Sequence, residues 1–327
     1  MTEPLLDTRG LTKHFPVRGG VFLRTVGKVH AVDDVSFKLR RGETLGLVGE
    51  SGSGKSTVAK TLLRLYEPTK GTVFFEGRDI TTLSKKELRR LRRDIQIIFQ
   101  DPFESLNARH TVGKILEEPF IIHNLGTPSE RQSWIRELLE KVGLEASAVN
   151  RFPHEFSGGQ RQRIGIARAI ALKPKLIVCD EAVSALDVSI QSQVINLLLT
   201  LQREMNLALI FIAHDLAVVK HVSDQVAVMY LGEIIEIASA TEIYETPRHP
   251  YTKALISAIP TPDPTERRDR VILVGDMPSP IKPPNGCRFH TRCHYARENC
   301  KQHKPDLEQV SDSGSVACHH WPDLART

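Results

Sequence analysis

The sequence has no apolar run that approaches the ~20 consecutive residues an α-helix needs to cross a bilayer. Its N-terminus, Met-Thr-Glu-Pro-Leu-Leu-Asp, also lacks the basic and apolar regions of a secretory signal peptide. We therefore expect a cytoplasmic protein that reaches a membrane only through a partner. The net charge of +5 is too small an excess to indicate nucleic-acid binding by itself. At 327 residues with 40% apolar content, the chain can form one large or two modest globular domains.

Cysteines are few, and close Cys-x2–4-Cys pairs of the kind common in zinc sites are absent. One cysteine, Cys179, lies inside an apolar run. The other four follow one another near the C-terminus, in the pattern Cys287-x5-Cys293-x6-Cys300-x17-Cys318. In a cytosolic chain such a group indicates a metal rather than disulfides. Four thiolates suit either a tetrahedral Zn²⁺ or an iron–sulfur cluster, and the wide spacing favours the larger cluster.

One short stretch indicates the chemistry: Gly49-Glu50-Ser51-Gly52-Ser53-Gly54-Lys55-Ser56-Thr57. It follows an apolar run at residues 44–48 that predicts a buried strand, and a run with helical apolar spacing comes after it. This order of strand, Gly-x4-Gly-Lys-Ser and helix is the context of a phosphate-binding P-loop. Lys55 can reach the terminal phosphates, and the hydroxyl of Ser56 can hold Mg²⁺. The sequence therefore predicts a nucleotide-binding protein.

The apolar pattern predicts an α/β core with an inserted helical subdomain. Residues 5–48 alternate as antiparallel strands do, and the helix after the P-loop should stop near residues 67–69, where Pro68 interrupts it. From about residue 110 to 172 the spacing is helical, and this block separates two strand-rich segments. Expected helices lie at residues 112–122, 129–142, 160–172 and 188–205, with a short capped one from 84. Expected strands lie at 73–75, 95–99, 176–180, 207–213 and 226–229.

The chain changes character after about residue 245, where prolines become frequent and apolar residues sparse. We expect residues 1–245 to form the nucleotide-binding domain. We expect residues 246–327 to form an irregular C-terminal appendix that needs a cross-link for stability. Two features stay open. Phe15 is either a core aromatic or a platform on which a base stacks. The basic residues between 85 and 93 form either a nucleic-acid patch or a solvated helix face.

Polar residues end several of the predicted strands. Asp180 and Glu181 follow a fully apolar strand, at the edge where open α/β sheets bind ligands. Asp180 can hold Mg²⁺, and Glu181 can orient or deprotonate an attacking water. Gln100 and His214 end two other apolar strands, so we expect both at the same edge, within reach of Mg²⁺, water or the γ-phosphate.

A second phosphate-type loop opens a helix of the helical block. Ser157 can cap the helix, and Gly158 and Gly159 leave backbone N–H groups open to an anion ahead of Gln160. One nucleotide does not readily need two such loops from one chain. The second loop would be explained if it served a neighbouring copy.

Six motifs, in this order along the chain, resemble those of the nucleotide-binding domains of ABC transporters: residues 49–57, Gln100, residues 157–160, residues 176–181, residues 184–187 and His214. The resemblance covers roughly residues 5–240. It implies ATP hydrolysis by two such domains facing head to tail. Each ATP would be held by the P-loop and Phe15 of one domain, with Mg²⁺ on Ser56, Gln100 and Asp180, and by residues of the other domain: Ser157, Gly158, Gly159, Gln160 and Asp187. Glu181, His214 and Gln100 would be catalytic.

The segment Pro247-Arg-His-Pro-Tyr-Thr-Lys-Ala-Leu-Ile256 narrows the resemblance to ATPases of oligopeptide and dipeptide permeases, closest to the second ATPase of a dipeptide permease pair. Segment 100–107 and Tyr230-Leu-Gly232 also suit that group. Phe156 replaces the usual Leu of the signature, and Ala182 stands where the family usually has Pro. In the family, cysteines in this pattern are associated with a [4Fe–4S] cluster, which we expect on Cys287, Cys293, Cys300 and Cys318, with Zn²⁺ as the alternative.

The resemblance implies an ATPase subunit of a di- or oligopeptide importer. Its expected partners are a paralogous second ATPase, two transmembrane permease subunits and an extracytoplasmic peptide-binding protein, with no nucleic acid. It would lie on the cytoplasmic face of the inner membrane. An importer of nickel or another small solute is the alternative. Soluble ribosome-associated ATPases carry two sets of these motifs, and DNA-repair ATPases carry a long coiled-coil insertion, so both fit this chain less well.

Overall fold

The computed structural model describes residues 3–19, 24–101, 105–259 and 270–324. They form two compact units. The first comprises Met1–Leu39, Thr44–Thr81 and Ala213–Thr327, and the second comprises Arg40–Glu43 and Thr82–Ile212. Residues 102–104 of the segment after Gln100, and the prolines at 260, 262 and 264, lie outside the described residues. No described helix is long and apolar enough to span a membrane.

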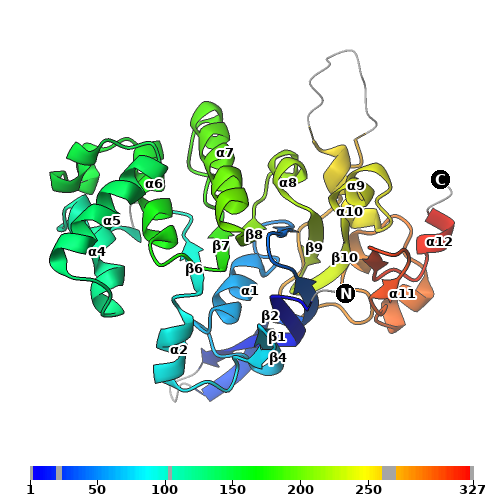
Figure 1. Cartoon of the computed structure of the whole chain (residues 1–327). Coiled ribbons are helices and arrows are strands. Elements are labelled where there is room, and N and C mark those ends of the chain that lie inside the picture. Colours follow the sequence, from blue (N-terminus) through cyan, green and yellow to red (C-terminus); the bar gives the residue numbers. More distant parts are fainter. Residues whose placement is uncertain (1–2, 20–23, 102–104, 260–269, 325–327) are drawn as a thin grey trace, which may run out of the picture. The chain divides into compact units, whose positions relative to one another are not determined.

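The first unit contains an antiparallel sheet whose strands come from the N-terminal part of the sequence (Figure 1). Its strands are β1 (Leu6–Gly19), β2 (Arg24–Leu39), β4 (Lys70–Phe75) and β5 (Arg78–Asp79), in the order β2-β1-β4-β5. All three pairings are antiparallel. The alternation thus predicted the strand type correctly for β1 and β2, where one face of β2 packs inward and the other is exposed. The prediction was wrong for residues 44–48 at the end of the range, which are fully buried and pair in parallel.

The same unit joins strands from distant parts of the sequence. β3 (Thr44–Val48) pairs in parallel with β9 (Gln225–Tyr230), which pairs antiparallel with β10 (Glu233–Ser239). The short strands β12 (Ser315–Val316) and β11 (Glu308–Gln309) continue from β10. Helices of this unit are α1 (Lys55–Leu62), α8 (Leu216–Val222), α9 (Ala240–Glu245), α10 (Pro250–Ser257), η3 (His290–Arg292), α11 (Glu298–Gln302) and α12 (Trp321–Leu324).

The second unit has a parallel core and a helical block. β6 (Ile95–Ile98), β7 (Leu176–Asp180) and β8 (Ala208–Ile212) are parallel, with β7 in the middle. The helices α4 (Val112–Ile122), α5 (Pro128–Lys141) and α6 (Gly158–Ile170) lie together in Figure 1. The remaining elements are α2 (Lys85–Leu91), η1 (Ala146–Asn150), η2 (Pro153–Glu155) and α7 (Val188–Met205). The predicted inserted helical block is therefore present.

Several predicted boundaries differ by a few residues, and the largest difference lies at the end of the helix after the P-loop. The helix after the P-loop ends at Leu62 rather than near Pro68. Arg64 takes a left-handed backbone conformation with φ of +52°, and its guanidinium donates to the carbonyl oxygens of Ile80 and Thr81. Contacts with a distant segment therefore end the helix before the proline does.

Candidate functional site

The P-loop lies in the first unit, between the buried strand β3 and α1. Its glycines take conformations that other residues rarely adopt, with φ of +149° at Gly49 and +107° at Gly54. A Cβ at Gly54 would lie 2.2 Å from the carbonyl oxygen of Ala31, so this position requires glycine. The Lys55 side chain bends back into the loop, where Nζ donates to the carbonyl oxygens of Gly49 and Glu50 at 2.8 and 2.9 Å. A cation is thus held at the N-terminus of α1, where an anion is stabilised.

Two residues from the end of the chain contact the second residue of this loop. The backbone N–H of Glu50 donates to the Tyr251 hydroxyl at 2.9 Å. The carboxylate of Glu50 accepts from Arg292 at 2.9 Å. No sequence pattern predicted either contact, although Tyr251 belongs to the segment that carried the resemblance to peptide permeases.

Phe15 and His214 also belong to the first unit. Phe15 is half-buried, which is not the burial of a core aromatic. The edge of its ring meets Tyr66 at 5.2 Å between centroids, and Nζ of Lys13 lies 4.9 Å from the ring centre. His214 is exposed and precedes Asp215, whose side chain caps α8.

The second unit brings Gln100 and Glu181 together. Asp180, 5% exposed, is the last residue of β7. Glu181 follows with a left-handed φ of +50°, which turns its carboxylate out of the strand direction. Nε2 of Gln100 donates to this carboxylate at 2.8 Å. Ala182 stands where the family that this sequence resembles usually has proline, and it is 2% exposed. Two residues predicted to act in catalysis are therefore in direct contact.

The Ser157 loop is a capped helix start. The Ser157 hydroxyl accepts from the N–H of Gln160 at 3.3 Å, and the Gln160 side chain accepts from the N–H of Ser157 at 3.0 Å. Gly159 packs against the next helix, because a Cβ there would lie 2.3 Å from Cγ2 of Ile190. Asp187 caps that helix, α7, by accepting from the N–H of Ile190. The loop and Asp187 therefore lie on adjoining helix starts, and the ends of the Ser157 and Gln160 side chains are exposed.

The four C-terminal cysteines of the first unit line one small cavity of about 20 Å³, together with His249, Phe289, His290, His319 and His320. Burial raises the pKa of the Cys287 thiol to about 12 and that of Cys318 to about 11. The neighbouring sulfurs contribute a smaller part of this rise. Thiols that are this hard to ionise need a positive metal to become thiolates. The four residues that spacing alone grouped are thus close in space.

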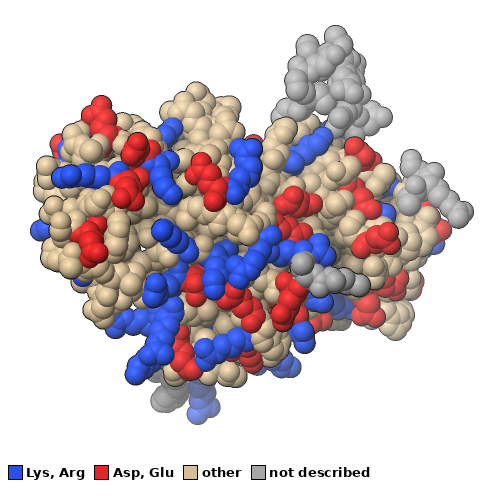
Figure 2. Space-filling view, in the orientation of Figure 1, with Lys and Arg blue, Asp and Glu red and all other residues tan. Residues whose placement is uncertain are grey.

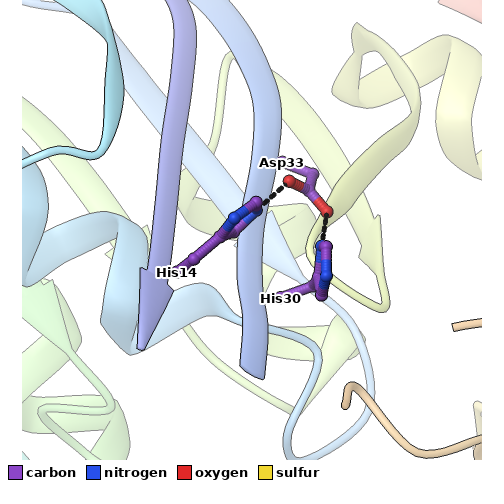
Figure 3. Close-up of side chains that lie close together, drawn as sticks. All are labelled: His14, His30 and Asp33. Carbon is purple, nitrogen blue, oxygen red and sulfur yellow. Dashed lines mark hydrogen bonds and ion pairs between the residues drawn. The ribbon is translucent and has the colours of Figure 1, made fainter. Parts of the chain in front are cut away.

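A further polar group on β1 and β2 was not predicted from the sequence. Asp33 lies between His14 and His30 (Figure 3): its carboxylate contacts Nε2 of His14, and Nδ1 of His30 lies 3.0 Å away. Arg288 also donates to Asp33 and pairs with Glu233. Although burial would raise the pKa of Asp33, hydrogen bonds from Arg288, His14 and His30 lower it below its ordinary value. The guanidinium already neutralises the carboxylate, so this group is a structural tie rather than a cation site.

The basic residues around α2 form an exposed face (Figure 2). All six are solvent-exposed: Lys85, Lys86, Arg89, Arg90, Arg92 and Arg93. Leu88 alone is buried on α2. This is the arrangement of a solvated amphipathic helix.

Three features together define an ATP-binding cassette ATPase. They are a P-loop after a buried strand, a pair of acidic residues at a strand end with a glutamine bonded to one of them, and a capped serine–glycine loop.

Comparisons with known proteins agree with this class and refine it. The ABC transporter family profile matches residues 32–184, and that of the oligopeptide/dipeptide transporter C-terminal region matches residues 235–300. The oligopeptide transport ATP-binding protein AppF of Bacillus subtilis (strain 168) is 54% identical over 320 residues, covering 97% of each chain. The chain therefore belongs to the ATP-binding subunits of the oligopeptide/dipeptide family of ABC transporters.

Solved structures show the same fold. A dimeric ATP-binding cassette in a post-hydrolysis state, bound to ADP and Pi, is 29% identical with a TM-score of 0.64 over 72% of this chain and 98% of that chain. The cbiO1 protein of Clostridium perfringens, part of the ABC transporter complex cbiONQ, is 27% identical with a TM-score of 0.64 over 75% and 93% of the two chains.

Proposed function

We propose that this chain is the ATP-hydrolysing subunit of an ABC importer for di- or oligopeptides. The observation that carries the proposal is the 54% identity to an oligopeptide transport ATP-binding protein along 97% of both chains. The match of residues 235–300 to the oligopeptide/dipeptide C-terminal region supports it independently, because that region lies largely beyond the ATPase motifs.

In the proposed reaction, residues 49–57 bind the phosphates of ATP and Phe15 stacks on the base. Ser56, Gln100 and Asp180 would hold Mg²⁺, which supplies charge neutralisation at the phosphates. The carboxylate of Glu181 would accept the proton of the attacking water, and His214 would contact the γ-phosphate. The Gln100–Glu181 hydrogen bond of 2.8 Å supports these roles, because it fixes the orientation of the proposed base.

A second ATPase would complete the site. The exposed Ser157–Gln160 loop and Asp187 would contact the ATP held by the P-loop of that partner. The corresponding loop of the partner would contact the ATP held by the P-loop of this chain. The dimeric ADP-bound cassette that shares this fold supports a dimer. We propose a paralogue as the partner. ATP-driven closure and reopening after hydrolysis would move two permease subunits at the cytoplasmic face of the inner membrane, with an extracytoplasmic binding protein delivering the peptide.

The test of the enzyme is Glu181→Gln, which keeps the shape of the side chain and removes its basicity. We expect ATPase activity to fall by about 100-fold or more, as for the loss of a general base, while ATP affinity stays within about twofold. Glu204→Gln on the exposed face of α7 is the control and should hydrolyse ATP normally. Wild-type-like hydrolysis by Glu181→Gln would contradict the assigned chemistry.

The test of the substrate uses the ATPases reconstituted with permease subunits in vesicles. We expect ATPase stimulation by a binding protein loaded with a dipeptide or oligopeptide. Stimulation by a nickel-loaded binding protein, with none by peptide, would favour the alternative importer.

We also propose two domains: a nucleotide-binding domain at residues 1–245 and, beyond it, a peptide-permease C-terminal region at residues 246–327.

We further propose a [4Fe–4S] cluster on Cys287, Cys293, Cys300 and Cys318, with Zn²⁺ as the alternative. The donor set fits both. The four cysteines line one cavity, which supports a shared metal group on them. The absence of close Cys-x2–4-Cys pairs from the sequence favours the cluster over zinc. The small cavity requires lining side chains to move outward for it. Iron and sulfide analysis of anaerobically purified protein tests the proposal, and stoichiometric zinc without iron would refute it.

A further inference from the structure

Glu50 is the point at which the C-terminal segment contacts the P-loop. Its N–H and its carboxylate are held by Tyr251 and Arg292, which lie 201 and 242 residues further along the chain. The carbonyl oxygen of Glu50 is also one of the acceptors of the Lys55 ammonium, at 2.9 Å. The three polar groups of this one residue therefore connect Tyr251, Arg292 and the P-loop lysine.

The contact is enclosed rather than superficial. The Arg292 side chain is 8% exposed and that of Glu50 is 29% exposed. Tyr251 is fully buried. A charge-assisted hydrogen bond in such surroundings fixes geometry more strongly than an exposed pair does.

Arg292 is carried by the loop between the first two C-terminal cysteines. Phe289 of the same loop is 2% exposed. Its ring packs on Tyr230 and Tyr251, with centroids 5.3 and 5.4 Å away. At the start of the loop, the N–H of Cys287 donates to the carbonyl oxygen of Cys300 at 2.8 Å. The short segment from Cys287 to Cys293 thus places both the thiols and the guanidinium.

We propose that Arg292 and Tyr251 are positioning residues for the P-loop, and that a metal group on the four cysteines raises nucleotide affinity through them. A P-loop binds phosphate only when its backbone N–H groups converge, so fixing Glu50 favours the binding conformation. A metal bound to the thiols restrains both ends of the loop that carries Arg292. By linkage, nucleotide binding must then strengthen metal binding by the same factor. The positioning role stands without a metal, whereas the regulatory role rests on the proposed cysteine site.

The first experiment measures the affinity of the full-length chain for a fluorescent ATP analogue with Mg²⁺, using Arg292→Gln, Arg292→Lys and Tyr251→Phe. We expect Arg292→Gln to weaken binding by about 10-fold, the scale of one charge-assisted hydrogen bond, and Tyr251→Phe by about 3-fold. Arg292→Lys should restore part of the affinity. The control is Arg297→Gln, whose guanidinium is 63% exposed and pairs with an exposed Asp323; its affinity should be unchanged.

Thermal unfolding and steady-state kinetics separate positioning from simple stability. A positioning role raises the KM for ATP with little change in kcat. If Arg292→Gln and Tyr251→Phe lower the unfolding temperature and leave nucleotide affinity and KM unchanged, the proposal is overturned. Should Arg292→Gln not fold, the Tyr251→Phe measurement decides, because that variant removes one hydroxyl and keeps the aromatic packing.

The second experiment compares metal-loaded and metal-depleted protein. In the wild type, we expect removal of the metal to weaken nucleotide binding, whereas in Arg292→Gln it should have little further effect because the connection is already broken. Equal weakening in both proteins would overturn the coupling. Protein that purifies with neither iron nor zinc would defeat the cysteine-site proposal and the regulatory role, and the affinities of the Arg292 variants would still decide the positioning role.

Discussion

The contacts of Asp33 allow a quantitative prediction for Asp33→Asn. The carboxylate, 15% exposed, accepts from His14, His30 and Arg288, and the Arg288 side chain is itself only 11% exposed. Breaking a buried pair costs about 3–5 kcal/mol and an exposed one about 0–1 kcal/mol. Because this group is neither fully buried nor exposed, we expect a loss of about 2 kcal/mol. For a chain of 327 residues, that lowers the unfolding temperature by roughly 3 °C.

The pH dependence provides the sharper test. The pKa of Asp33 is lowered from 3.8 by its partners in the folded state. Its stabilisation is therefore present above that ordinary value and is lost as the pH falls through the lowered value. Differential scanning fluorimetry of wild type and Asp33→Asn should show a constant gap at neutral and mildly acidic pH that closes only below about pH 4. The control, Asp34→Asn, changes the same charge at the adjacent exposed residue and should unfold like wild type. No gap at pH 7, or a gap that closes near pH 6, would refute the reasoning.

Two further predictions concern the nucleotide site. Lys55→Ala removes the ammonium at the start of α1 and should weaken ATP binding by about 10-fold or more in a fluorescent-nucleotide titration; retained tight binding would count against the P-loop assignment. Gly159→Ala places a Cβ 2.3 Å from Ile190 and should lower ATPase activity while leaving nucleotide affinity at the P-loop intact, whereas Gly165→Ala, whose added Cβ meets nothing within 4 Å, should behave as wild type in the same assays.

Local signals predicted much of the fold. The helical spacing of apolar residues predicted both ends of α4 and of α7 correctly. Each helix begins at a capping side chain, Thr111 for α4 and Asp187 for α7. The motif at Ser157 was likewise visible in sequence, since a capping box needs only residues three apart. The exposed basic face of α2 was one of two interpretations, and the burial of Leu88 fits the solvated one.

Contacts between distant segments could not be predicted in this way. No local pattern indicates that Tyr251 and Arg292 meet Glu50, because their separation of more than 200 residues is closed by the folding of the whole first unit. The Asp33 group has the same origin: His14 and His30 meet it through the pairing of β1 with β2, and Arg288 arrives from the C-terminal segment. Even the end of α1 depends on such a contact, that of Arg64 with residues 80 and 81.

The discontinuous first unit has a consequence for how the protein is made. Its P-loop strand β3 pairs with β9, and β9 with β10, whose edge receives β12 near the C-terminus. On the ribosome, which releases the chain from its N-terminus, the second unit is nearly complete once residue 212 has emerged, whereas the first waits for the last residues. Until then Tyr230 and Tyr251 lack Phe289, and the edge of β10 is open to wrong partners. The contacts of the P-loop with Tyr251 and Arg292 can therefore form only after residues more than 200 positions further along the chain have been synthesised.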